Sequence, residues 1–179
     1  QGLRVTLSDQ KLEPIANAVH QARRLCQRKH RSAIQTRETL DRLIPDPDNH
    51  GIASADLIIE AVPENLEVKR ALYALIEPRM QDSAILATNT SSIPLDQLAE
   101  SLRKPERFLG LHFFNPVSEM LVVEVVRHAS ARGETDASAL QSALALTGAI
   151  GKLPISVASY PGFLVNRALT PYLLEAVTM

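Results

Sequence analysis

The sequence lacks the features that would place it in several large classes of protein. Its 19 basic and 20 acidic residues give a net charge of −1, so no excess of positive charge is available for nucleic acid. Its apolar runs are of strand length and are interrupted by residues such as Glu60, whereas a membrane span needs roughly 20 apolar residues. A single cysteine, Cys26, excludes an intrachain disulfide and fits a reducing compartment. We therefore expect a globular protein with no nucleic-acid partner, no membrane span and no metal site.

What the sequence does contain is an alternation of short apolar runs with amphipathic helix patterns. Strands are predicted at residues 3–9, 56–63, 84–88 and 108–113, and helices begin near Pro14, Val68 and Pro94. Repeated strand–helix pairs predict an α/β fold in which a mostly parallel sheet carries helices on its faces. Ligands of such sheets bind beyond the carboxyl ends of the strands.

Polar residues stand at these carboxyl ends: Asp9, Glu64, Asn89, Ser91 and His112. Because the ends of parallel strands meet at one edge of a sheet, we expect five polar groups from distant parts of the chain to gather in one crevice. Some of them also have a local explanation. Ser91 could cap the following helix, and Glu64 could belong to a first helical turn.

Residues 110–116 (Gly-Leu-His-Phe-Phe-Asn-Pro) and 121–126 (Leu-Val-Val-Glu-Val-Val) place a His at the end of one apolar run and a carboxylate inside the next. A carboxylate among valines is costly unless a donor or a cation meets it, and His112 is the nearest plausible partner of Glu124. A carboxylate fixes the tautomer of a His and stabilises its imidazolium, so this pair would make a general base. The alternative is a structural His near a strand end.

The pattern changes after this pair. Thr135 can cap a helix that runs to about residue 150, and residues 153–157 suggest an edge strand because Pro154 cannot donate to a ladder. Residues 161–162 (Pro-Gly) mark a boundary. The following segment, 163–179, is predicted to be a helix that is apolar on most sides, has a kink at Pro171 and needs a partner to bury it.

Five blocks of the sequence, in order, together resemble the L-3-hydroxyacyl-CoA dehydrogenase family. They lie at residues 60–65, 89–92, 110–116, 123–125 and 161–167. The resemblance implies an enzyme of fatty-acid β-oxidation that oxidises L-3-hydroxyacyl-CoA to 3-ketoacyl-CoA with NAD. It also implies a Rossmann-type domain followed by a helical domain used in dimerisation.

The resemblance assigns roles to individual residues. The catalytic residues that it implies are His112, Glu124, Ser91 and Asn166, and the cofactor-binding residues are Asp9, Gln10, Ala61, Val62, Glu64, Lys69, Asn89, Ser91 and Asn115. A carboxylate at the end of the second strand accepts hydrogen bonds from ribose hydroxyls and repels a 2′-phosphate. Asp9 therefore predicts a preference for NAD over NADP, which the nearby Lys11 could soften.

The family pattern also has parts without a counterpart in this sequence. The family opens with a strand and a Gly-rich turn whose backbone amides receive the pyrophosphate, and no G-x-G-x-x-G motif occurs here. We therefore expect a Rossmann-type, doubly wound sheet without its first strand. The predicted domains are an N-terminally truncated NAD-binding domain at residues 1–160 and the first helix of an all-helical domain at 161–179. The predicted function therefore belongs to the intact protein.

Several alternatives share these motifs. One is a related NAD(P)-dependent dehydrogenase acting on 3-hydroxybutyryl-CoA or on a sugar acid, and another is a non-catalytic relative of the lens-crystallin type. The retention of His112, Glu124, Ser91 and Asn166 argues against the second. The family resemblance further implies an acyl-CoA substrate, a homodimer for the intact protein and membership of a β-oxidation complex. It implies a cytoplasmic location in a bacterium, or a mitochondrial or peroxisomal one in a eukaryote.

Overall fold

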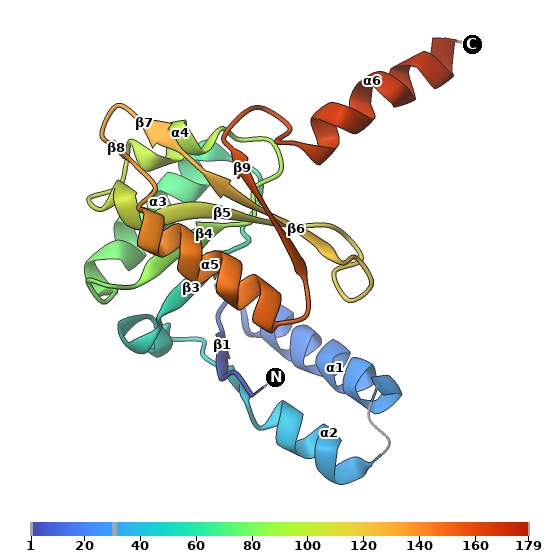
Figure 1. Ribbon diagram of the computed structural model, residues 1–179. Helices are drawn as coiled ribbons and strands as arrows, with labels where there is room; N and C mark the ends of the chain where they lie inside the picture. Colours follow the sequence, from blue (N-terminus) through green and yellow to red (C-terminus); the bar gives the residue numbers. More distant parts are fainter. Residues whose placement is uncertain (1, 30–31, 179) are drawn as a thin grey trace. The chain divides into compact units, whose positions relative to one another are not determined.

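The chain forms two compact units in a computed structural model, which describes residues 2–29 and 32–178 (Figure 1). The first unit covers Gln1–Ala53 and the second covers Ser54–Met179. The predicted boundary between residues 160 and 161 is a different division, and it stays a prediction. No helix in the described part of the chain is long and apolar enough to cross a membrane.

The first unit contains a small parallel sheet and two helices. Strand β1 (Val5–Leu7) pairs in parallel with β2 (Leu43–Pro45), and the helices are α1 (Leu12–Lys29) and α2 (Ala33–Leu40). The predicted first strand and helix are present, although β1 is shorter than residues 3–9. Neither α2 nor β2 was predicted, because residues 32–54 are too polar to show a clear apolar period.

The second unit is built on a five-stranded sheet. Its order is β3 (Leu57–Glu60), β4 (Ile85–Thr88), β5 (Phe108–Phe113), β6 (Val122–Arg127) and β9 (Leu153–Ala158). The first three strands are parallel to one another, β6 runs antiparallel to β5, and β9 runs parallel to β6. A short antiparallel hairpin, β7 (Ala129–Ser130) and β8 (Gly133–Glu134), follows β6. The predicted fold class, an α/β fold with a mostly parallel sheet, is confirmed.

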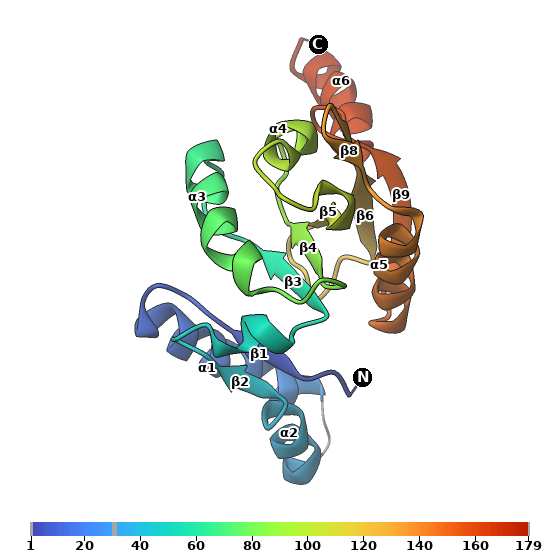
Figure 2. The same cartoon turned by 90° about the vertical axis from the view of Figure 1, so that its left-hand side faces the viewer.

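Helices cover both faces of this sheet. Figure 2 shows α3 (Leu66–Ile76) and α5 (Ala137–Ala149) on opposite sides of it. Because side chains alternate along a strand, alternate residues of β5 and β6 face α5. The core on this side consists of Ile85, Ala87, Leu109, Leu111, Val123, Val125, Ala139 and Ala143. The other face of β5 carries Phe108, Gly110 and His112.

A short helix, α4 (Leu95–Ala99), packs closely against that other face. A Cβ atom added at Gly110 would lie 2.9 Å from Cβ of Val126 and 3.2 Å from Cδ2 of Leu95. Glycine therefore lets α4 and β6 approach the middle of β5, next to His112. Two 3₁₀ turns complete this side, η2 (Glu77–Arg79) after α3 and η3 (Pro105–Arg107) before β5, while η1 (His50–Ser54) precedes β3.

The predicted cap of the helix after β8 is wrong. Asp136, not Thr135, is the N-cap residue of α5. The hydroxyl of Thr135 donates to the Phe108 carbonyl at 2.9 Å and accepts from the His128 backbone N–H at 3.1 Å. Thr135 has these partners because it lies beside β5 and β6 in space, and sequence spacing does not show that neighbourhood.

The last two predicted elements are present. Strand β9 is an edge strand of the five-stranded sheet, as Pro154 indicates. Helix α6 spans Val165–Thr178 and contains Pro171. Its large apolar side chains are exposed, among them Leu169, Tyr172, Leu173, Leu174 and Val177. These exposures agree with the expectation that the helix needs a partner.

Candidate active site

The register of β5 and β6 brings His112 and Glu124 together. The two residues are directly opposite each other in the antiparallel pair, and side chains at such positions share one face of the sheet. Nδ1 of His112 lies 2.7 Å from Oε2 of Glu124. The Glu124 side chain is fully buried and the His112 side chain is 7% exposed. The predicted pairing is thus present in the fold, whereas its catalytic role stays a prediction.

The hydrogen bond assigns the tautomer of His112. A carboxylate only accepts, so Nδ1 carries the proton and donates it to Glu124, which leaves the lone pair of Nε2 as an acceptor. Nε2 has no hydrogen-bond partner among the described residues. The ring is held between two aromatic rings, Phe114 at 4.5 Å and Phe163 at 5.5 Å between centroids. His112 is therefore fixed in place with one nitrogen left for a ligand.

Glu124 also holds the start of α6. Its second oxygen, Oε1, accepts from the backbone N–H groups of Leu164 at 2.9 Å and Val165 at 2.8 Å. These are donors at a helix N-terminus, where a negative charge is favourable. Asn166 follows immediately in α6. One buried carboxylate therefore connects the His112 ring to the segment that carries Asn166, another of the predicted catalytic residues.

A second group of polar residues surrounds Glu64, in the loop between β3 and α3. Oε1 of Glu64 accepts from the Thr90 hydroxyl at 2.5 Å, from the backbone N–H of Ser91 at 3.0 Å, and from both the N–H and the hydroxyl of Ser92 at 2.9 Å. Burial alone would raise the pKa of the Glu64 carboxyl, but these hydrogen bonds outweigh burial and lower the pKa to about 2. Glu64 is thus a carboxylate anion, and in this form it holds the loop that contains Ser91.

Lys69, a predicted cofactor contact, is turned away from the surface. Its side chain is 1% exposed, and its ammonium lies 2.6 Å from Oε1 of Glu60 and 3.6 Å from Oε2 of Glu64. It also donates to the Val62 carbonyl at 3.3 Å. The structure therefore places Lys69 behind Glu64, and a direct contact with a cofactor stays a prediction.

Glu60 is the member of this group that the sequence prediction missed. It ends β3 and its side chain is fully buried. The signal was present in the sequence, because Glu60 interrupts an apolar strand as Glu124 does, and the same need for a cation or donor applies to it. The cation is Lys69, one helical turn into α3. The apolar period of that helix does not reveal that Lys69 faces Glu60.

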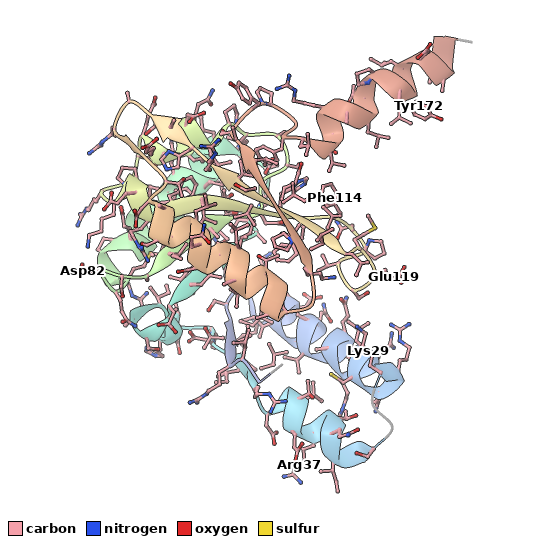
Figure 3. The ribbon with its side chains drawn as sticks, viewed as in Figure 1. Lys29, Arg37, Asp82, Phe114, Glu119 and Tyr172 are labelled. Carbon is pink, nitrogen blue, oxygen red and sulfur yellow. The ribbon has the colours of Figure 1, made fainter. Side chains whose placement is uncertain are left out.

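The remaining predicted residues of the second unit lie in the loops after β3, β4 and β5. Ala61 is exposed and Val62 donates its N–H to Glu60 at 2.8 Å. Asn89 accepts the N–H of Phe113 on Oδ1 at 3.0 Å and so ties the ends of β4 and β5 together. Asn115 is exposed and precedes a cis proline peptide bond. Figure 3 labels Phe114 in this region and Asp82, which precedes β4, on the opposite side of the unit.

The predicted residues Asp9 and Gln10 belong to the first unit. Both are exposed and follow β1, and Oδ1 of Asp9 accepts the backbone N–H of Lys11 at 3.0 Å. Their place in one site with the residues of the second unit stays a prediction.

Comparisons with known proteins identify one family. The family model described as "3-hydroxyacyl-CoA dehydrogenase, NAD binding domain" matches residues 1–160. The fatty acid oxidation complex subunit alpha of Psychrobacter sp. (strain PRwf-1) is 40% identical over 176 residues, which cover 96% of this chain and 24% of that protein. The chain thus spans about a quarter of the length of this curated relative.

Solved structures give the same result. The 3-hydroxybutyryl-CoA dehydrogenase of Escherichia coli has a TM-score of 0.89 at 40% identity, over 97% of this chain and 37% of that one. The (S)-3-hydroxybutyryl-CoA dehydrogenase of Ralstonia eutropha has a TM-score of 0.87 at 32% identity, over 98% and 62%. The chain belongs to the 3-hydroxyacyl-CoA dehydrogenase family, within which it matches the NAD binding domain. The predicted family and its NAD cofactor are confirmed.

Proposed function

We propose that the protein containing this chain oxidises L-3-hydroxyacyl-CoA to 3-ketoacyl-CoA with NAD, in the β-oxidation of fatty acids. The observation that carries this proposal is the buried hydrogen bond of 2.7 Å between His112 and Glu124, which leaves Nε2 of His112 ready to accept a proton. A base of this kind is what the oxidation of an alcohol by hydride transfer requires, since the hydroxyl proton must leave with the hydride.

The residues around Glu64 fit a nicotinamide dinucleotide. Among the described residues, all four hydrogen bonds that Glu64 accepts end on Oε1, and the one charged neighbour of Oε2 is the Lys69 ammonium at 3.6 Å. A partly exposed anion with an open oxygen is a good acceptor for sugar hydroxyl groups. Glu64 and the loop that contains Ser91 would hold the cofactor in this unit. Asn115, which follows β5, would be a further contact.

The chemical step divides between a hydride and a proton. NAD supplies the acceptor for the hydride that leaves carbon 3 of the acyl chain. Nε2 of His112 takes the proton of the 3-hydroxyl group, and the C–O single bond becomes the carbonyl of the product. Glu124 accepts the Nδ1 proton throughout and stabilises the imidazolium that forms.

Two further side chains have roles at the substrate oxygen. Ser91 and Asn166 would donate hydrogen bonds to the hydroxyl or carbonyl oxygen and so position it against His112. Glu64 holds the Ser91 backbone, and Glu124 holds the start of α6 just before Asn166. Both donors are thus supported by carboxylates that are themselves buried or hydrogen bonded.

The length of the acyl chain distinguishes two forms of this proposal. The solved relatives named 3-hydroxybutyryl-CoA dehydrogenase favour a four-carbon substrate, and the curated relatives named for fatty acid oxidation favour longer ones. A sugar acid is the remaining alternative. The test is NADH formation by the full protein with L-3-hydroxyacyl-CoA substrates of increasing chain length and with sugar acids. If the protein binds NAD normally but turns over none of the acyl-CoA substrates, the proposal is wrong.

The assembly and location belong to the same proposal. The curated relatives are bacterial subunits of a fatty acid oxidation complex, which supports membership of such a complex and a cytoplasmic location. The exposed apolar side chains of α6 support burial of this helix in a homodimer of the intact protein.

A further inference from the structure

Glu60 is a charged residue at a buried position where an apolar side chain would need no hydrogen-bond partners. Its carboxylate is buried and accepts four hydrogen bonds, so each oxygen has two donors. Oε1 accepts from the Lys69 ammonium at 2.6 Å and the Val62 N–H at 2.8 Å, and Oε2 accepts from the hydroxyls of Tyr73 at 2.8 Å and Thr88 at 2.9 Å. These donors come from the loop after β3, from α3 and from the end of β4.

The contacts continue from Glu60 to Glu64 by two routes. On one side, the Lys69 ammonium lies between the two carboxylates, 2.6 Å from Glu60 and 3.6 Å from Glu64. On the other side, Thr88 donates to Glu60 and accepts the N–H of Thr90 at 3.3 Å, and the Thr90 hydroxyl donates to Glu64 at 2.5 Å. The five residues form a closed ring of polar contacts.

We propose that Glu60 is a positioning residue that sets the conformation of Glu64 and of the Ser91–Ser92 loop through this ring. Glu60 has a fully buried side chain beneath the loops, so it acts through its neighbours. Its carboxylate balances the Lys69 ammonium, so that Lys69 supports Glu64 without drawing its open oxygen inward. The part of this inference that concerns NAD rests on the proposed function, whereas the part that concerns the loop does not.

A structural role alone accounts less well for the ring. Replacing a buried ion pair by apolar groups of similar volume is often neutral or stabilising, so core stability does not require Glu60 and Lys69. The Glu60 carboxylate, which is buried and has two donors on each oxygen, instead fixes one geometry of its neighbours. Burial and the charge of Glu60 also raise the pKa of Tyr73, which keeps its phenol a donor to Glu60. The ring includes Glu64, which holds the backbone N–H of Ser91, and both residues belong to the candidate site.

The first readout needs no cofactor. The backbone N–H groups of Ser91 and Ser92 donate to Glu64, and both residues are exposed, so their hydrogen exchange reports directly on this hydrogen bonding. In the full protein without ligand, Glu60→Gln is expected to speed their exchange about tenfold. Glu77→Gln is the matched control, because Glu77 also accepts backbone N–H groups, from Arg103 and Lys104, outside the ring. It should leave exchange at Ser91 and Ser92 unchanged.

The second readout is the dissociation constant of NADH, measured by its fluorescence on binding. Glu60→Gln is expected to weaken NADH binding about tenfold, and Glu77→Gln is expected to leave it unchanged. Tyr73→Phe removes one of the four donors and should have a smaller effect of the same kind.

The double variant Glu60→Gln/Lys69→Met separates positioning from stability, because it removes both buried charges. Its melting temperature should recover relative to Glu60→Gln, while exchange at Ser91 and Ser92 and the affinity for NADH stay impaired. If exchange and affinity recover together with the melting temperature, Glu60 is only structural and the proposal is wrong. If the parent protein binds no NADH, the proposed function fails instead, and the exchange rates still decide the role of Glu60.

Discussion

Two buried carboxylates of the second unit, Glu124 and Glu60, have similar surroundings and different partners. Each ends or interrupts an apolar strand, and each has a fully buried side chain that only accepts hydrogen bonds. Glu124 accepts from His112 and from two backbone N–H groups at the start of α6. Glu60 accepts from a lysine, two hydroxyls and one backbone N–H.

The difference lies in what each partner can do next. The His112 ring has a second nitrogen that can accept a proton, so the charge of Glu124 can act on a chemical step. The Lys69 ammonium is enclosed between two carboxylates and a carbonyl, so the charge of Glu60 can act only on the arrangement of its neighbours. A buried carboxylate therefore gains its function from the group that it holds.

The largest effect is expected when the imidazole of His112 is removed. His112→Gln in the full protein should reduce turnover by roughly 10²- to 10⁴-fold, the usual contribution of a general base. The dissociation constant of NADH should change little, because the His112 imidazole is held by Glu124 and is separate from the residues around Glu64 that we propose to hold the cofactor. Steady-state kinetics together with NADH titration measure the two quantities. A large loss of NADH affinity with normal turnover would refute the role of His112 as the base.

A smaller loss of turnover, about 10- to 100-fold, is expected for Glu124→Gln, since it affects the base only through one partner. From the sequence, glutamine retains shape and an acceptor, but the structure shows why it is a poor substitute. Glu124 accepts three N–H groups on two oxygens, so the amide NH₂ of glutamine must face at least one donor.

Asp9 offers a contrast, because it is an exposed carboxylate in the first unit. Asp9→Asn removes the charge that should repel a 2′-phosphate, and we expect the preference for NAD over NADP to fall about tenfold. The ratio of kcat/KM for the two cofactors measures this preference. A parent protein that uses both cofactors equally well would contradict the assignment of Asp9.

The smallest effect concerns stability in acid. The pKa of Glu64 is lowered to about 2 from 4.5, so its contribution to folding is present above about pH 4.5 and is lost as the pH falls towards 2. Between about pH 5 and pH 3, the urea midpoint of the parent protein should therefore fall more than that of Glu64→Gln. Equal falls in the two proteins would show that Thr90, Ser91 and Ser92 do not hold the carboxylate in its charged form.

The sequence predicted those parts of the fold that a local pattern encodes. The strands through His112 and Glu124 follow from short apolar runs, and the partnership of these two residues follows from the cost of a buried charge. The antiparallel direction of β6 aligns the pair, and that direction is a property of the sheet. The hydrogen bonds that Glu124 accepts from the backbone N–H groups of Leu164 and Val165 could not be predicted, because they join residues that are about 40 positions apart in sequence.

The same limit explains Glu60 and Thr135. The rule that a carboxylate in an apolar strand needs a partner applied to Glu60, but identifying Lys69 and Thr88 as its partners required the packing of α3 and β4. Thr135 has the right chemistry for a cap, but its hydroxyl donates to the Phe108 carbonyl instead. The family resemblance names candidate residues of the site, and only the fold shows which of them touch one another.

The most direct test of the different functions of the two carboxylates compares Glu124→Gln with Glu60→Gln in the same assay. For each variant, kcat at saturating NAD and the dissociation constant of NADH are measured beside the parent protein. Glu124→Gln should lower kcat and leave the dissociation constant nearly unchanged, whereas Glu60→Gln should raise the dissociation constant and change kcat less. If both variants lose kcat and affinity in the same proportion, the two carboxylates do not have separate functions, and the account given for them is wrong.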